Sequence, residues 1–166
     1  KFYMDVSETP MKTAHARYVV EELKAKRPAV IYQTTAYGQS GRQYLADAFQ
    51  KLGVAVVYEE GVAATAKDLK PVIAKALEAR PDALVLHLHA GSTALLIRQA
   101  AGIAGVPRIV AGSAMHQPAT AALLEPAELK DVCAESGSSP ISGGSPAIEE
   151  WTRAYRAQFK DDPDAF

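Results

Sequence analysis

Short apolar stretches alternate with amphipathic stretches along the whole chain. Apolar or β-branched runs occupy residues 29–32, 54–58, 83–88, 108–111 and 131–134, and their length is typical of strands. Between these runs, apolar residues recur every three or four positions, as they do on one face of a helix. Strands that alternate with helices form βαβ units. The pattern therefore predicts an α/β fold with three layers, in which a doubly wound, mostly parallel sheet carries helices on both faces.

Two of the predicted helices lie near the ends of the chain. Thr9 and Pro10 are typical of a helix start, and Pro146 precedes a second run of apolar residues at helical spacing. The polar residues 136–145, rich in glycine and serine, are expected to form the loop before the last helix. Ala14, Tyr18, Val19 and Leu23 are expected on one face of the first helix, and Ile148, Trp151, Tyr155 and Phe159 on one face of the last.

The bulk composition argues against several classes of partner. A chain of 166 residues fits one domain, and its formal net charge of -1 argues against nucleic acid or an anionic membrane surface. The apolar runs are too short to cross a bilayer, so we expect no direct insertion into a membrane. The single cysteine, Cys133, cannot form an internal disulfide and is expected to be a buried thiol.

The carboxyl ends of the predicted strands are the expected place for a ligand. In an open parallel sheet, small ligands bind where the loops leave these ends. The polar segment after the first strand begins at Gln33 and reaches Tyr37, whose ring would stand at the mouth of a crevice. An aromatic ring with a hydroxyl suits a partly apolar ligand. The other expected ligand segments are residues 87–92, 112–116 and 135–139.

The segment after the third strand carries two histidines and a helix start. His87 and His89 are two residues apart, so on a strand they would share one face. His89 could donate a hydrogen bond to a carboxylate or carbonyl of a solute, whereas His87 is expected to be a hydrogen-bonded residue of the core or rim. Ser92 is expected to cap the next helix, whose first backbone N–H groups favour an anionic or carbonyl oxygen.

Four stretches, taken in order, resemble one protein family. They are AVIYQTTAYGQSGRQYLADAFQKLGVAVVYEEG, AKDL, RPDALVLHLHAGSTALLIRQAAGIAGV and AIEEWTRAYRAQFKDDPDAF. The series covers nearly the whole chain and resembles the second lobe of a type I periplasmic binding protein, in the leucine/isoleucine/valine branch of ABC-transporter solute-binding proteins. The resemblance implies that residues 1–166 form a single flavodoxin-like lobe, the C-terminal one of two, with the first lobe and the hinge returns absent.

The resemblance also implies a function. Members of this family hold a small solute between two lobes and deliver it to ABC permease subunits at the membrane, without catalysis and without a cofactor. A periplasmic or extracellular location is expected, with the signal peptide in the missing N-terminal part. The sequence agrees with a role other than catalysis, because it contains no nucleophile elbow, GxGxxG or Walker loop.

The family pattern also indicates which residues of this lobe contact the solute. Tyr37 matches a position whose aromatic ring packs on the ligand, and His89 lies near a second aromatic ligand position. The remaining expected ligand contacts are Ala90, Gly91, Ser92, Ser113 and Ala114.

This chain departs from the family pattern after the fourth strand. Amino-acid-binding members tend to place a carboxylate there, which pairs with the ligand ammonium, but residues 112–116 read GSAMH. Glu135 could substitute, although it is expected to face solvent. A buried ammonium needs a charged partner. A small carboxylate or amide is therefore expected to fit this rim at least as well as an amino acid.

Three other functions stay open at this stage. His87, His89 and His116 would lie on neighbouring strand ends and could bind zinc or copper, although no Cys, Asp or Glu completes a set at ligand spacing. Ser113 and His116 are close enough in sequence to be considered as a catalytic pair. A ligand-sensing receptor domain of the same fold is the alternative to transport.

Overall fold

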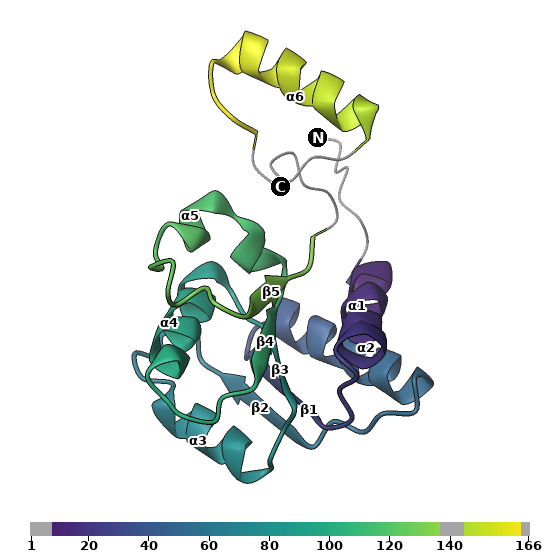
Figure 1. The fold of residues 1–166 in the computed structure, drawn as a ribbon, viewed down its shortest axis with the longest axis vertical. Coiled ribbons are helices and arrows are strands. Elements are labelled where there is room, and N and C mark those ends of the chain that lie inside the picture. Colours follow the sequence, from purple (N-terminus) through teal and green to yellow (C-terminus); the bar gives the residue numbers. More distant parts are fainter. Residues whose placement is uncertain (1–7, 137–144, 164–166) are drawn as a thin grey trace.

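One five-stranded parallel sheet forms the centre of the fold in the computed structural model, which describes residues 8–136 and 145–163 (Figure 1). The strands are β1 (Pro28–Gln33), β2 (Tyr58–Val62), β3 (Ala83–His87), β4 (Arg108–Ala111) and β5 (Val132–Ala134). Their order is β2-β1-β3-β4-β5, and every neighbouring pair is parallel. The chain winds outward from β1 to β2 and then returns past β1 to β3, so the topological switch point lies between β1 and β3.

Helices cover both faces of this sheet, which confirms the predicted fold class. The α-helices of the described residues are α1 (Glu8–Arg17), α2 (Ala36–Lys51), α3 (Lys70–Glu78), α4 (Ala90–Ala101), α5 (Pro118–Ala121) and α6 (Pro146–Phe159), and the first five cover the sheet. A π-helical turn, η1 (Tyr18–Glu22), extends α1, and a 3-10 turn, η2 (Ser113–His116), follows β4. Figure 1 shows α1 and α2 on one face and α3, α4 and α5 on the other. None of the helices that the structure describes combines the length and apolar character of a membrane span.

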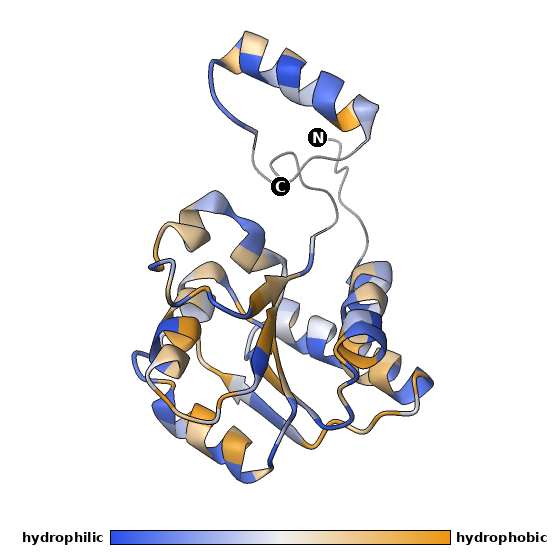
Figure 2. Ribbon diagram, in the orientation of Figure 1, coloured by the Kyte–Doolittle hydropathy of each residue, from blue (hydrophilic) through white to orange (hydrophobic). Residues whose placement is uncertain are grey.

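Each face of the sheet has its own apolar core, because consecutive strand residues point to opposite faces. On one side, Val30 of β1 and Val85 of β3 pack with Phe49 of α2. On the other side, Ile31 of β1 packs in a cluster that includes Ile73 of α3. Figure 2 shows β5 and most of β4 as hydrophobic, between helices that carry both hydrophilic and hydrophobic residues. Full burial of one such side chain contributes roughly 1.5–3 kcal/mol, and the two cores together hold the strand ends in register.

The second strand lies four residues further along the sequence than the apolar pattern predicts. The β-branched residues 54–58 suggest a strand, but the segment that pairs with β1 is Tyr58–Val62, with Ala29 opposite Tyr58. Val54 and Val56 instead pack against the core from the connection that precedes β2. Cross-strand register outweighs local β propensity here, and an edge position tolerates the more polar segment.

The buried face of α1 is partly polar, which the sequence pattern did not predict. Ala14 is exposed, whereas Lys12, His15, Ala16 and Val19 are buried. The physical reason is that the two polar side chains reach a carboxylate from the far end of the sheet. A buried ion pair allows a lysine to occupy a place that hydropathy alone would give to an apolar residue.

The last helix begins at Pro146 as predicted, but Figure 1 shows α6 set apart from the sheet. Trp151 and Phe159 share one face of α6, as their spacing predicts, but they are 51% and 57% exposed. Both faces of the sheet are already covered by α1 to α5. The rings of α6 pack on one another instead, with centroid distances of 5.4 Å from Trp151 to Tyr155 and 4.6 Å from Tyr155 to Phe159. Most of the predicted loop before α6, residues 137–144, lies outside the described residues.

Candidate ligand-binding site

The carboxyl ends of the strands meet at one edge of the sheet, and the amino-terminal end of α1 lies beside them (Figure 1). We call this region the carboxyl edge. It is formed by Glu8, Lys12, His15, Tyr37, His87, His89, Ser113 and Glu135. The predicted ligand segments after β1, β3 and β4 all reach it, as does the start of the segment after β5. Residues 137–139 of that last segment are outside the described range.

Tyr37 lies in the first turn of α2. The Oγ1 atom of Thr35 caps this helix by accepting a hydrogen bond from the backbone N–H of Gly38, at 3.3 Å. A Cβ atom on Gly38 would lie 1.9 Å from the carbonyl oxygen of Gln33, so only glycine allows the helix to start this close to β1. Burial raises the pKa of Tyr37 to about 12, so the hydroxyl is neutral at pH 7 and can donate a hydrogen bond.

Two imidazole rings pack against the ring of Tyr37. Its centroid is 4.1 Å from that of His87, with the planes tilted by 35°, and 5.0 Å from that of His89, with the planes at 26°. Offset contacts of this kind stabilise an aromatic ring by about 0.5–1.5 kcal/mol each. The two histidines therefore hold Tyr37 in one orientation at the carboxyl edge.

His87 is fully buried and neutral. Its Nε2–H donates a hydrogen bond to the backbone carbonyl of Tyr37 at 3.2 Å, and the carbonyl, which can only accept, decides the tautomer. Nδ1 has no hydrogen-bond partner among the described residues, so the expectation of a hydrogen-bonded histidine holds for one nitrogen. Burial lowers the pKa of His87 to about 3, and the charge of Lys12 adds to the shift. The ring leaves no room at Gly41, where a Cβ atom would lie 2.0 Å from Nε2.

His89 is exposed at the start of α4, where it occupies the N-cap position. Its Nε2 atom lies 3.1 Å from Oγ1 of Thr35, and its backbone N–H donates to Oε1 of Gln33 at 3.2 Å. Gln33 in turn donates from Nε2 to the carbonyl of Val62 at 2.7 Å. This chain of hydrogen bonds ties the ends of β1, β2 and β3 together and places His89 beside Tyr37.

Ser92 does not cap α4, contrary to the sequence expectation. It is the third residue of the helix and is buried, while His89 occupies the cap position without a side-chain cap bond. Between His89 and Ser92, Ala90 is half-buried and Gly91 is exposed. Ser113 and Ala114 lie in η2, and each is 8% exposed. These five residues stand at the ends of β3 and β4, as the sequence predicts.

Glu135 is held inside the protein, although it was expected to face solvent. Its side chain is 6% exposed and forms an ion pair with Nζ of Lys12, which is 2% exposed. Oε2 of Glu135 accepts from Nδ1 of His15 at 2.9 Å, and the backbone N–H of Ser113 donates at 3.3 Å to Oε1, the oxygen that is paired with Lys12. Burial alone would raise the pKa of Glu135, but the hydrogen bond from His15 and the charges of His15 and Lys12 outweigh it and hold the value at about 2. Three donors thus occupy this carboxylate.

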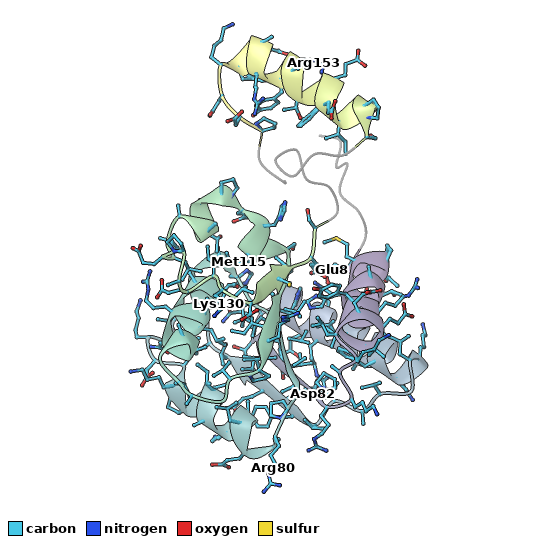
Figure 3. All side chains as sticks on the ribbon, viewed as in Figure 1. Glu8, Arg80, Asp82, Met115, Lys130 and Arg153 are labelled. Carbon is cyan, nitrogen blue, oxygen red and sulfur yellow. The ribbon has the colours of Figure 1, made fainter. Side chains whose placement is uncertain are left out.

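Glu8 brings a second carboxylate to the same edge from the first turn of α1 (Figure 3). Its Oε1 atom lies 4.0 Å from Nε2 of His87, and its side chain is 32% exposed. The sequence prediction considered only the ends of the strands, so it missed the residues that α1 contributes to the carboxyl edge. A signal was present, since Glu8, Lys12 and His15 are spaced four and three residues apart and so share one helix face.

A metal site of His87, His89 and His116 receives no support from the part of the chain that the structure describes. Residues 8–136 and 145–163 contain no group of three His, Cys, Asp or Glu side chains that could hold a metal ion. His87 is buried against Tyr37, whereas His89 is exposed and hydrogen-bonded to Thr35. His116 is half-buried, and its Nε2 atom has no hydrogen-bond partner within the described ranges.

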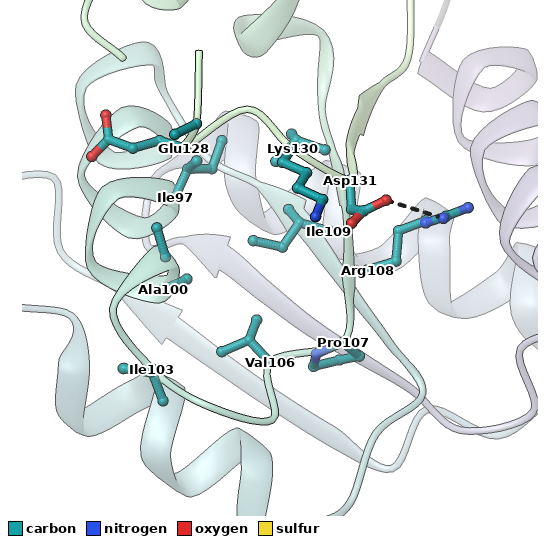
Figure 4. Close-up of a pocket in the computed structure, with 13 residues that line it drawn as sticks. Ile97, Ala100, Ile103, Val106, Pro107, Arg108, Ile109, Glu128, Lys130 and Asp131 are labelled. Carbon is teal, nitrogen blue, oxygen red and sulfur yellow. Dashed lines mark hydrogen bonds and ion pairs between the residues drawn. The ribbon is translucent and has the colours of Figure 1, made fainter. Parts of the chain in front are cut away.

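Two cavities lie away from Tyr37. One, of about 440 Å³, lies at the amino-terminal ends of β4 and β5, with an apolar wall that includes Ile97 and Ile109 and an ion pair between Arg108 and Asp131 at its rim (Figure 4). The other, of about 360 Å³, lies between α1 and β5 and is lined in part by His15 and Cys133. Cys133 is half-buried there instead of fully buried, with Sγ 3.3 Å from the hydroxyl of Tyr18.

Comparison with known families decides the identity of this fold. The family model described as "Periplasmic binding protein" matches residues 2–166. The chain belongs to this family. A curated relative, the Leu/Ile/Val/Thr-binding protein of Salmonella typhimurium, is 33% identical over 60 residues, which are 36% of this chain and 16% of that protein.

Solved structures share the fold of this periplasmic binding protein lobe. A putative branched-chain amino acid ABC transporter protein from Rhodospirillum rubrum superposes with a TM-score of 0.83 at 24% identity, over 95% of this chain and 45% of that one. A solute-binding protein of an ABC transporter from R. palustris, in complex with benzoate, superposes with a TM-score of 0.76 at 14% identity, over 97% of this chain and 44% of that one. This chain therefore spans less than half the length of the proteins that share its fold.

Proposed function

We propose that this chain is the C-terminal ligand-binding lobe of a two-lobe, extracytoplasmic solute-binding protein that serves an ABC importer. The bound solute is a small molecule, an amino acid or a small carboxylate or amide, held in the cleft between this lobe and the other. Family membership and the coverage of less than half of each similar structure support this reading. The parent protein delivers the solute to permease subunits at the membrane and catalyses no reaction.

The main observation behind the proposal is that Tyr37 is held in place at the carboxyl edge. Tyr37 lies beside the switch point between β1 and β3, where open α/β sheets bind ligands, and its ring packs against His87 and His89. A half-buried ring fixed in this way offers a flat apolar surface and a neutral hydroxyl donor.

The remaining contacts come from the starts of α4 and η2. His89 and the first backbone N–H groups of α4, at Ala90, Gly91 and Ser92, are placed to donate to an oxygen of the solute. Ser113 and Ala114 form the neighbouring wall after β4. The other half of the contacts comes from the first lobe.

A pair of tyrosine variants of the full-length protein tests the site. Tyr37→Ala is expected to weaken solute binding by about tenfold or more in calorimetric titration, because it removes the ring on which the solute packs. Tyr44→Ala, on the exposed side of the same helix, is the matched control and is expected to bind as the parent does. Equal binding by Tyr37→Ala and the parent would remove Tyr37 from the site.

The two-lobe arrangement is tested by the 166-residue chain itself. A solute enclosed between two lobes loses about half of its contacts when one lobe is absent. The isolated chain is therefore expected to bind any solute of the full-length protein at least about a hundredfold more weakly. Equal affinity in calorimetric titration would contradict the shared cleft.

A further inference from the structure

The larger of the two cavities lies at the other end of the strands from Tyr37, between α4 and the starts of β4 and β5 (Figure 4). Its volume of about 440 Å³ is within the range of roughly 300–1,000 Å³ that is typical of small-molecule sites. Because the strands are all parallel, the starts of β4 and β5 are separated from the carboxyl edge by the length of the strands. A ligand in this cavity would therefore not meet the residues of the carboxyl edge.

The wall of this cavity is apolar where α4 and β4 form it. Ile97 and Ala100 of α4 and Ile109 of β4 belong to the apolar core on that face of the sheet. Ile103 and Val106, in the connection between α4 and β4, also line the cavity and are only half-buried. An apolar chain laid against them would remove more of their surface from water, which favours binding.

The rim of the cavity carries four charged side chains, and three of them form ion pairs. Asp131 pairs with Arg108 at 3.3 Å, and Glu128 pairs with Arg98 at 3.3 Å. The fourth is Lys130, and within residues 8–136 and 145–163 neither a hydrogen bond nor an ion pair engages its ammonium group. The rim therefore has one positive charge that no neighbour neutralises.

The charge of Lys130 is directed toward the apolar wall. Figure 4 shows its side chain pointing toward Ile109, whereas the neighbouring Asp131 points toward Arg108. An ammonium group beside an apolar surface is complementary to a molecule with a carboxylate at one end and an apolar chain at the other. A cationic ligand would meet Lys130 as a like charge and would find both acids of the rim already paired.

We propose that this cavity is a second ligand site, which takes a small amphipathic carboxylate. The apolar chain of the ligand packs on Ile103, Val106 and Ile109, and its carboxylate accepts a hydrogen bond from the ammonium group of Lys130. All of these residues belong to this lobe and lie away from the carboxyl edge. The inference therefore goes beyond the proposed function and does not depend on it.

The test uses the full-length protein and three probes. Octanoate and heptylammonium share a heptyl chain and carry opposite charges, and acetate carries the carboxylate without the chain. Nuclear magnetic resonance spectra of the backbone amides follow residues 97–109 and 128–132, which surround the cavity. Octanoate is expected to shift these signals with an affinity about tenfold higher than that of heptylammonium or acetate, because it alone matches both the wall and the charge.

A matched pair of lysine variants isolates the charge. Lys130→Met keeps most of the apolar stem, and it is expected to weaken octanoate binding at the cavity about threefold to fivefold, as for an exposed ion pair, without weakening heptylammonium. Lys51→Met changes an exposed lysine of α2, on the opposite face of the sheet, and is expected to bind octanoate as the parent does. Circular dichroism checks that each variant is folded.

A variant of the carboxyl edge separates this site from the solute site. In Tyr37→Ala, octanoate is expected to shift the cavity signals with unchanged affinity, whatever happens to solute binding. Loss of those shifts in Tyr37→Ala would show that octanoate acts from the carboxyl edge, and would overturn the inference. The same conclusion would follow from no shift at about 10 mM octanoate, from equal affinities for octanoate and heptylammonium, or from equal octanoate affinities in Lys130→Met and Lys51→Met.

Discussion

Lys12 and Glu135 are 123 residues apart in the sequence, and they form an ion pair inside the protein with side chains only 2% and 6% exposed. The pair joins the first helix to the end of the last strand of the sheet. It also fixes η2, because the carboxylate accepts from the backbone of Ser113. This contact between α1 and the end of β5 thus holds the carboxyl edge together.

Removing one partner of this pair is expected to destabilise the lobe strongly. Lys12→Met leaves the Glu135 carboxylate buried with only His15 and the Ser113 amide, and should cost about 3 kcal/mol in the free energy of unfolding measured by urea denaturation. The double variant Lys12→Met, Glu135→Leu should recover most of that loss, since it leaves neither the ammonium nor the carboxylate buried without its partner. A single variant as stable as the parent would show that the pair is not buried in solution.

Acid should unfold the lobe partly through Glu135. Its pKa in the folded protein, about 2, is below its ordinary 4.5, so the stability it contributes is present above about pH 4.5 and is lost as the pH falls toward 2. Urea midpoints measured across this range should fall less steeply in Glu135→Gln than in the parent. Parallel curves would mean that Glu135 titrates alike in the folded and unfolded chains.

His87 should remain neutral well below the ordinary range of histidine. Its folded pKa of about 3 is below the ordinary 6.5, so the stability that it contributes is present above about pH 6.5 and declines as the pH falls toward 3. In nuclear magnetic resonance spectra, the ring signals of His87 should not shift between pH 8 and pH 5. The same ring in urea should titrate near 6.5. A folded-state titration near 6.5 would contradict the burial of this ring.

A methyl group at Gly41 should disrupt the packing behind Tyr37. In Gly41→Ala the new Cβ atom would lie 2.0 Å from Nε2 of His87, and relieving this clash should cost about 1–3 kcal/mol. The melting temperature is expected to fall by several degrees in calorimetry. Gly102→Ala is the matched control, because the nearest atom to its Cβ would be 3.9 Å away. Equal melting temperatures for the two variants would contradict the close packing.

The last helix should be independent of the sheet. Trp151 is the single tryptophan and is 51% exposed, so iodide should quench its fluorescence efficiently in the 166-residue chain. Deleting residues 145–166 should change the free energy of unfolding of the remainder by less than about 0.5 kcal/mol, measured by circular dichroism in urea. A loss of more than about 1 kcal/mol would show that α6 packs on the sheet.

Local sequence pattern was sufficient where one strand or helix decides its own structure. The run at residues 108–111 is β4 without any shift, and Leu69, at the cap of α3, is buried together with Ile73 and Ala76 of that helix, as their spacing predicts. The position of β2 depends on pairing with β1, and there the sequence pattern was misleading. Residues 54–58 have β propensity, yet β1 pairs with Tyr58–Val62. Burial of the α6 aromatic face could not be judged from spacing, which identifies an apolar face but not what covers it.

The sequence by itself determined the class of fold and the place of Tyr37 and His89 at the carboxyl edge. Hydrophobic periodicity and the rule for parallel sheets act through neighbours in the chain, so they can be read without coordinates. Only the tertiary structure decided the charges of the site. The role of Glu135 depends on its burial and on partners more than a hundred residues away, Lys12 and His15, which set the cost of moving the carboxylate and have no trace in local pattern.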